Sequence, residues 1–94
     1  MLRRVLKQIR DKVRSRQYVM TLHAEEQMSD DELTIFDVER GLLTGEIVER
    51  QKDAPTGEWK YLVRGRTVAG DEISVVGKIG VTGKLVIITV YRSW

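Results

Sequence analysis

The chain has 94 residues, of which 41% are hydrophobic and 32% charged, with one proline and a formal net charge of +2. This length and composition are typical of one globular domain and exclude a multidomain enzyme, a disordered chain and a collagen-like repeat. With no cysteine and a single histidine, His23, the sequence excludes disulfides, thiolate metal sites, a cysteine nucleophile and two-histidine metal motifs.

Other absences in the sequence exclude further classes of protein. No glycine-rich loop of the kind that cradles nucleotide phosphates is present, and no apolar run approaches the roughly 20 residues that span a bilayer. Charged residues interrupt the N-terminal stretch where a signal peptide would have its apolar core. We therefore expect a cytoplasmic protein with no cofactor, no metal and no membrane partner. Any reaction it catalyses would depend on proton transfer and electrostatics.

The charges are segregated along the chain. Residues 1–16 carry seven basic residues and one acidic residue, whereas residues 17–49 carry nine acidic residues and one basic residue. Residues 57–94 carry six basic residues and three acidic ones. Two basic zones that flank an acidic zone favour a surface that steers a polyanion to one side. Ordinary solvated faces give the same pattern and are the alternative.

Three helices are predicted in the first half of the chain. Residues 2–15 form a basic, amphipathic helix, since apolar residues recur there at helical spacing. Residues 21–29 form a short helix that Thr21 caps, and residues 35–44 form a third helix that Gly45 ends. Thr34 and Asp37 have the spacing of a capping box at the start of the third helix.

From residue 46 the hydrophobic period changes to two, and β-branched residues dominate. The predicted strands cover residues 46–51, 59–67, 72–79 and 84–92. Connections this short make neighbouring strands antiparallel. We therefore expect one α+β domain over residues 1–94, with N-terminal helices packed on one face of a four-stranded antiparallel sheet. The last strand is apolar on both faces, which is typical of a central strand.

Basic residues of the predicted sheet are candidates for a binding surface. Arg64 and Arg66 lie two residues apart on one strand, so their side chains point to the same face. With Lys78 and Arg92 on neighbouring strands they predict a cationic patch, and solvated sheet edges are the alternative. His23, beside a helix start, is the candidate acid or base, although a lone histidine more often makes a structural hydrogen bond.

Four stretches of the chain resemble a bacterial family of small proteins with a domain of unknown function. They are LHAEEQM at residues 22–28, residues 34–47 from Thr-Ile-Phe-Asp-Val to Gly-Glu-Ile, YLVRGR at residues 61–66, and VIITVYR at residues 86–92. Members of that family are characterised by a His-Ala-x-x-Arg-Met helix, a Gly-Glu-Ile junction and a closing Thr-x-Tyr-Arg strand. The resemblance spans residues 20–92, and the order and spacing of the motifs are more specific than any single one.

The resemblance implies a fold shared with the barnase, EndoU, colicin and RelE-type ribonucleases, and a role as the toxin of a type II toxin–antitoxin pair. The implied activity is metal-independent cleavage of RNA, in which a base removes the ribose 2′-hydroxyl proton and cations stabilise the pentacoordinate transition state. The expected partners are RNA and a zinc-finger antitoxin of the MqsA type, and a homodimer is a further expected assembly.

The resemblance also assigns roles to residues of this chain. His23 would be the acid or base, and Arg64 or Arg66 would clamp the phosphate. The last strand would add three polar groups: Thr89, Tyr91 and Arg92. Unstacked bases would lie against an aromatic side chain such as Tyr91 or Trp94.

One residue departs from the family pattern. Gln27 stands where the family usually has arginine, four residues after the histidine. If that arginine binds phosphate, its loss weakens the activity, and if it is structural, Gln27 changes little. The alternative to a ribonuclease is therefore a non-enzymatic regulatory module that binds protein or nucleic acid through the basic first helix or the sheet edge. A third hypothesis places the basic helix on an anionic membrane surface.

Overall fold

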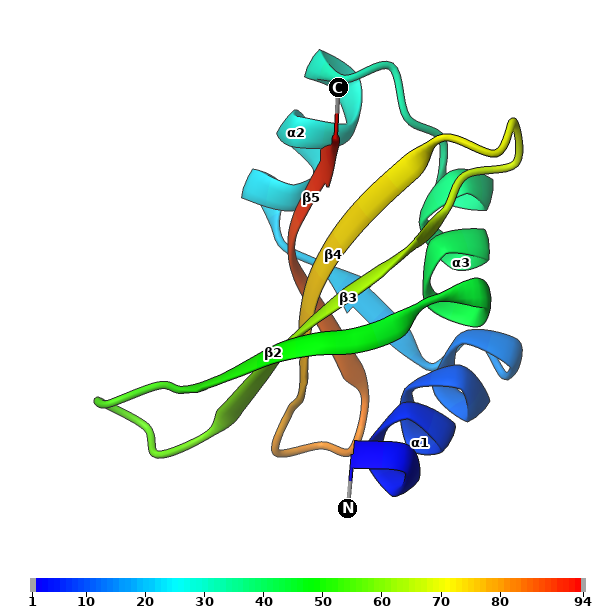
Figure 1. The fold of residues 1–94 in the computed structure, drawn as a ribbon. Coiled ribbons are helices and arrows are strands. Elements are labelled where there is room, and N and C mark those ends of the chain that lie inside the picture. The colour runs from blue at the N-terminus through cyan, green and yellow to red at the C-terminus, as the bar shows by residue number, and fades with distance from the viewer. Residues whose placement is uncertain (1, 94) are drawn as a thin grey trace.

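The computed structural model describes residues 2–93, which form three helices and one five-stranded sheet (Figure 1). The helices are α1 (Leu2–Arg14), α2 (Leu22–Asp30) and α3 (Ile35–Thr44). The strands are β1 (Tyr18–Met20), β2 (Glu46–Lys52), β3 (Trp59–Arg66), β4 (Glu72–Ile79) and β5 (Leu85–Arg92). The α+β class with three helices is confirmed, and the prediction of four strands was wrong.

The missing strand is β1. It pairs in parallel with β5 and completes the order β1-β5-β4-β3-β2, so the sheet is mixed and not purely antiparallel. Three residues are too few to show a period of two, and this pairing joins segments that lie far apart in the chain. The Tyr18 hydroxyl of β1 donates a hydrogen bond to the Glu39 carboxylate of α3. Burial and this hydrogen bond raise the pKa of Tyr18 to about 12, so the hydroxyl stays a neutral donor at physiological pH.

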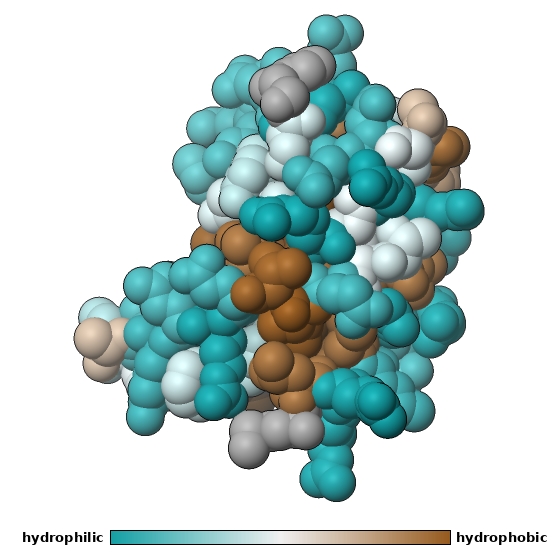
Figure 2. Space-filling view, viewed as in Figure 1, coloured by the Kyte–Doolittle hydropathy of each residue, from teal (hydrophilic) through white to brown (hydrophobic). Residues whose placement is uncertain are grey.

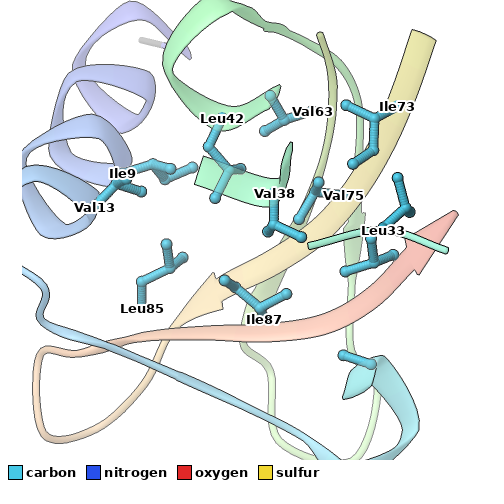
Figure 3. Packing of buried hydrophobic residues seen from close by; sticks show 12 residues of the cluster. Ile9, Val13, Leu33, Val38, Leu42, Val63, Ile73, Val75, Leu85 and Ile87 are labelled. Carbon is cyan, nitrogen blue, oxygen red and sulfur yellow. The ribbon is translucent and has the colours of Figure 1, made fainter. Parts of the chain in front are cut away.

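α1 and α3 cover one face of the sheet, and the core lies between them and the strands (Figure 1). Figure 3 shows Ile9 and Val13 of α1 and Val38 and Leu42 of α3 gathered over the sheet. The strands contribute six buried residues to the same cluster: Val63, Ile73, Val75, Leu85, Ile87 and Val90. We call the opposite face, which α1 and α3 leave uncovered, the open face.

α1 is the amphipathic helix that the spacing predicted. Its buried residues Leu6, Ile9 and Val13 face the core. The Arg10 guanidinium donates a hydrogen bond to the Gly45 carbonyl oxygen at 2.7 Å, which ties α1 to the end of α3. In the part of the chain that the structure describes, no helix is both long enough and apolar enough to cross a bilayer.

α3 approaches β3 closely because glycines face each other across the contact. A Cβ atom on Gly65 would lie 2.1 Å from the Gly41 carbonyl oxygen, and one on Gly45 would lie 2.6 Å from the same oxygen. Gly45 follows α3 as predicted, but its φ of −88° is open to any residue, so this glycine is needed for space. Because Gly65 faces the helix, Arg64 and Arg66 on either side of it both face away, as the sequence predicted.

The sequence predicted that all three helices lie on one face of the sheet, and for α2 this was wrong. α2 lies along the edge of the sheet instead. β1 pairs only with the first part of β5, and α2 runs beside the second part (Figure 1). The Gln27 side-chain oxygen accepts a hydrogen bond from the Val90 backbone N–H at 3.0 Å, and the Asp31 carboxylate accepts one from the Arg92 backbone N–H at 2.9 Å. Four helical residues rise about 6.0 Å and two strand residues about 6.6 Å, so the two spacings match. α2 thus supplies the acceptors that a sixth strand would otherwise supply.

The first prediction concerns the glycine contact between α3 and β3. Gly65→Ala should lower the free energy of unfolding by about 1–3 kcal/mol or more, since the new methyl group meets backbone atoms that cannot rotate away. Gly80→Ala is the matched control, because its new Cβ would meet the Val86 side chain at 3.2 Å and the Lys84 carbonyl oxygen only at an ordinary contact distance of 3.6 Å. It should stay within about 1 kcal/mol of the wild type. Urea unfolding measures both, and equal losses in the two variants would contradict the packing argument.

The second prediction concerns the edge of β5. Gln27→Met keeps the size of the side chain but removes the acceptor of the Val90 N–H, and should cost about 1–2 kcal/mol of unfolding free energy. Gln27→Glu keeps an acceptor at the same place and should retain most of the stability. Hydrogen exchange of the Val90 amide provides the second readout: it should be faster in the methionine variant than in the glutamate variant. If the amide exchanges at the same rate in both, the proposed role of Gln27 is wrong.

Candidate functional site

The outward-facing side chains of the sheet align in rows across the strands. The register pairs Glu46 of β2 with Arg64 of β3, Arg64 with Ser74 of β4, and Ser74 with Tyr91 of β5. Neighbouring strands are about 4.8 Å apart, so successive side chains of a row lie side by side. We call this set the Arg64 row.

Arg64 and Ser74 are in direct contact within the row. The Arg64 Nε donates a hydrogen bond to the Ser74 hydroxyl oxygen at 3.4 Å. Ser74 is fully buried although it faces outward, since its larger neighbours in the row flank it on both sides. Tyr91 is 37% exposed and Arg64 is also exposed, so both can contact a ligand on the open face.

A second row lies beside the first. It pairs Glu49 with Leu62, Leu62 with Val76, and Val76 with Thr89. A hollow of about 100 Å³ opens over the apolar middle of this row. Its lining comes from β2 to β5: Glu49, Arg50, Gln51, Lys60, Leu62, Val76 and Tyr91. An apolar floor with an aromatic wall and polar groups at the rim suits a flat ring that carries hydrogen-bonding edges.

A β-bulge brings Thr89 and Tyr91 to the open face. Gly77 pairs with Ile87 and Val76 with Thr89, which leaves Ile88 as an extra residue in β5. Strict alternation along β5 would place Thr89 and Tyr91 on the same face as Ile87. The bulge reverses the alternation, so Ile87 stays in the core while Thr89 and Tyr91 join the two rows.

Arg66 and Lys78 also face the open side but differ in their partners. Arg66 lies one row beyond Arg64, in register with Glu72. The Lys78 ammonium forms an ion pair with the Glu58 carboxylate at 3.3 Å, so its charge is compensated. Within residues 2–93, Arg64 and Arg66 form no ion pair, which leaves their charges available to an anion.

Arg92 turns away from the open face. Its guanidinium donates hydrogen bonds to the Asp71 carboxylate at 3.3 Å and to the Glu32 carbonyl oxygen at 3.4 Å. Its side chain is only 19% exposed. Arg92 therefore joins the end of β5 to the β3–β4 turn and to the segment after α2, and it does not lie on the open face with Arg64 and Arg66.

Asp37 lies in the same region as Arg92 and organises the start of α3. Its carboxylate accepts hydrogen bonds from the backbone N–H groups of Thr34 and Val68, both at 3.0 Å, and completes the predicted capping box. Burial alone would raise the pKa of Asp37. The hydrogen bonds from Thr34 and Val68 and the positive charge of Arg92 outweigh burial and lower the pKa of Asp37 below its ordinary value.

His23 lies in the first turn of α2, which Thr21 caps as predicted by accepting a hydrogen bond from the Ala24 N–H. The imidazole is exposed and, among the residues that the structure describes, has no hydrogen-bond partner. It lies one helical turn before Gln27, on the side of α2 that follows β5. The structure thus gathers Arg64, Thr89 and Tyr91 in adjacent rows, with no hydrogen bond that joins His23 to them. Trp94, the other aromatic candidate, lies outside the described residues.

A known protein family matches most of the chain. Residues 20–92 match the family model described as Domain of unknown function (DUF4258). The chain belongs to this family. The DUF4258 match includes α2, α3 and the open face, and α1 lies outside it. No curated protein and no solved structure matches the chain.

The sequence did not identify several residues that form the open face. Ser74 is the residue that Arg64 contacts, and Leu62 and Val76 form the floor of the hollow. Ser74 is a lone polar residue among apolar neighbours, a signal that becomes informative only when the register of β3 and β4 is known. Within residues 2–93, no three acidic or histidine side chains are grouped so that they could hold a metal ion.

The third prediction follows from the lowered pKa of Asp37. A carboxylate whose pKa is lower in the folded than in the unfolded protein contributes stability at neutral pH, and this contribution is lost as the pH falls from the ordinary pKa of about 3.9 through the lowered pKa of the folded state. Asp37→Asn should therefore destabilise the protein at pH 7, and the difference from the wild type should shrink toward pH 3. Urea unfolding at both pH values measures this, with Asp30→Asn as the exposed control. A penalty for Asp37→Asn that is the same at both pH values would contradict the assignment.

Proposed function

We propose that the open face binds single-stranded RNA and that the protein cleaves it by attack of the ribose 2′-hydroxyl, without a metal ion. The observation that carries this proposal is the Arg64 row. Within residues 2–93 Arg64 has no ion-pair partner, and it stands on an uncovered sheet in one row with the exposed Tyr91, while the buried Ser74 hydroxyl accepts its hydrogen bond. A guanidinium and an aromatic ring are groups that bind a phosphate and a base, which are the repeating parts of RNA.

Binding would use the two rows together. Arg64 and Arg66 follow one strand, two residues or about 6.6 Å apart, which is close to the spacing of phosphates along a nucleic-acid strand. A base from the same strand would stack on Tyr91 and fill the hollow over Leu62 and Val76. Single-stranded RNA suits this arrangement because its bases are free to leave the stack.

Cleavage would need one base and charge stabilisation. The His23 imidazole would take the proton of the 2′-hydroxyl, and the 2′-oxygen would form a bond to phosphorus. The bond from phosphorus to the 5′-oxygen breaks, the 5′-oxygen takes a proton from a water molecule, and the resulting hydroxide takes the proton that His23 removed, which returns the imidazole to its neutral form. Arg64 would stabilise the extra negative charge of the pentacoordinate phosphorus. The products are a 2′,3′-cyclic phosphate and a 5′-hydroxyl.

The second candidate function is RNA binding without cleavage. It is favoured by the surroundings of His23, because the exposed imidazole has no hydrogen-bond partner to orient it. A general base acts efficiently only when it is held within reach of the proton that it removes. The toxin role, the zinc-finger antitoxin and the relation to RelE-type ribonucleases go beyond a domain of unknown function, and remain part of this proposal.

The fourth prediction tests the proposed function. The wild type should cleave a single-stranded RNA in the presence of EDTA, and mass spectrometry should find cyclic phosphate ends. His23→Ala should reduce the rate by about 10²–10⁴-fold, the usual contribution of a general acid or base. Arg64→Ala should weaken both binding and cleavage. Arg40→Ala, which removes an exposed arginine from α3 on the covered side, should leave both unchanged.

The outcomes separate the two candidate functions. Cleavage that does not depend on His23 would remove the assigned base. RNA binding that depends on Arg64 but leaves the RNA intact would favour the second candidate. If the wild type neither binds nor cleaves RNA, the open face has another role.

A further inference from the structure

The two edges of the sheet differ in how many of their backbone groups have hydrogen-bond partners. At the β5 edge, β1 pairs with the first residues, and Gln27 and Asp31 of α2 satisfy backbone N–H groups further along. At the other edge, β2 is seven residues long, and no strand or helix of residues 2–93 pairs with its outer side. An unpaired edge exposes backbone donors and acceptors that can pair with another extended chain. The fold therefore supplies partners along β5, from β1 and from side chains of α2, whereas the seven-residue β2 has none on its outer side within residues 2–93.

An apolar groove runs beside this open edge. It lies between the first half of α1 and the start of β2, holds about 140 Å³, and is lined by Leu2, Arg3, Leu6, Glu46 and Ile47. Val48, the bulged residue of β2, is 49% exposed, and Leu2 is 39% exposed. Figure 2 shows hydrophobic surface in the middle of this view, between hydrophilic regions on both sides. We call the groove together with the outer side of β2 the edge groove.

The α1 side of the edge groove is positively charged: Arg3 lines the groove together with the acidic Glu46 of β2, and Arg4 and Lys7 follow on α1. Arg3 and Arg4 are exposed, and in the described part of the chain neither forms an ion pair. Lys7, one turn further along α1, is exposed and pairs only with Asp11 of the same helix. An occupant that carries acidic side chains would meet complementary charge here.

We propose that an extended, acidic segment of a partner protein adds to the sheet as a strand beside β2. Its backbone would pair with the outer side of β2, its inward apolar side chains would cover Leu2, Leu6 and Ile47, and its carboxylates would reach Arg3 and Arg4. A second copy of this chain fits less well. Pairing of β2 with β2 would bring together two copies of α1, each from a stretch with seven basic residues and one acidic residue. The proposal does not rest on RNA cleavage, because the edge groove shares no residue with the Arg64 row apart from Glu46.

The fifth prediction uses a synthetic probe and the full chain. A peptide of about ten residues that alternates valine and glutamate has the length and pattern of a strand, and should bind and slow hydrogen exchange of the β2 backbone amides. The same peptide with lysine in place of glutamate should bind at least about tenfold more weakly. Arg3→Glu with Arg4→Glu should weaken binding of the acidic peptide by a similar factor, and added salt should weaken it in the wild type.

Matched controls remove the general effects of charge and of lost apolar surface. Arg16→Glu with Lys84→Glu makes the same change in net charge at exposed positions remote from Arg3 and should leave peptide binding unchanged. Leu2→Asp should weaken binding, whereas Leu22→Asp, at an apolar residue of α2 that is 71% exposed, should not. Circular dichroism confirms that each variant is folded, and RNA binding reports separately on the open face.

Three results would overturn the proposal. The first is a peptide that binds without protecting the β2 amides. The second is equal binding of the acidic and basic peptides. The third is sedimentation that shows a dimer of the chain with β2 amides already protected in the absence of peptide, which would assign the edge groove to a second copy.

Discussion

The close approach of α3 to β3 is the constraint on which the other features of this protein depend. Gly41 and Gly45 of the helix and Gly65 of the strand leave so little space that a single Cβ on Gly65 would reach the helix backbone. This contact holds α3 close to the covered face. The hydrogen bond from the Arg10 guanidinium to the Gly45 carbonyl oxygen in turn ties α1 to the end of α3. It also fixes which way β3 faces. With Gly65 turned inward, Arg64 and Arg66 are turned toward the open face, where the candidate site lies.

Gln27 of α2 has a structural role at the edge of β5 that the family resemblance did not predict. The family resemblance led us to expect arginine at this position, but the chain has Gln27, whose side-chain oxygen accepts a hydrogen bond from the β5 backbone. Arginine has no acceptor and cannot make this bond. Gln27 therefore acts here as an edge-capping group that ties α2 to β5. Within residues 2–93, Arg64 and Arg66 remain cations without ion-pair partners on the open face.

The open face and the edge groove divide the surface between two kinds of ligand. The open face presents arginine, a hydroxyl group and an aromatic ring in rows whose neighbouring side chains lie about 4.8 Å apart, a pattern that fits a polymer of phosphates and bases. Within residues 2–93, the edge groove presents backbone without a strand partner, apolar side chains and the exposed Arg3, a pattern that fits an acidic extended chain. Because β2 contributes Glu46 to both surfaces, a partner at the edge groove would also change the border of the open face.

The sequence by itself determined the elements whose causes are local. The helices lie within one residue of their predicted bounds, because spacing, the Thr21 cap and the Thr34–Asp37 capping box act over a few neighbouring residues. The shared direction of Arg64 and Arg66 also follows from a period of two.

The tertiary structure alone decided the features that depend on distant partners. Three features join residues that are remote in the chain. They are the parallel pairing of β1, the bulge at Ile88 that turns Thr89 and Tyr91 outward, and the turn of Arg92 toward Asp71. No local pattern records such pairings, because they are fixed by strand register and packing rather than by the propensities of neighbouring residues.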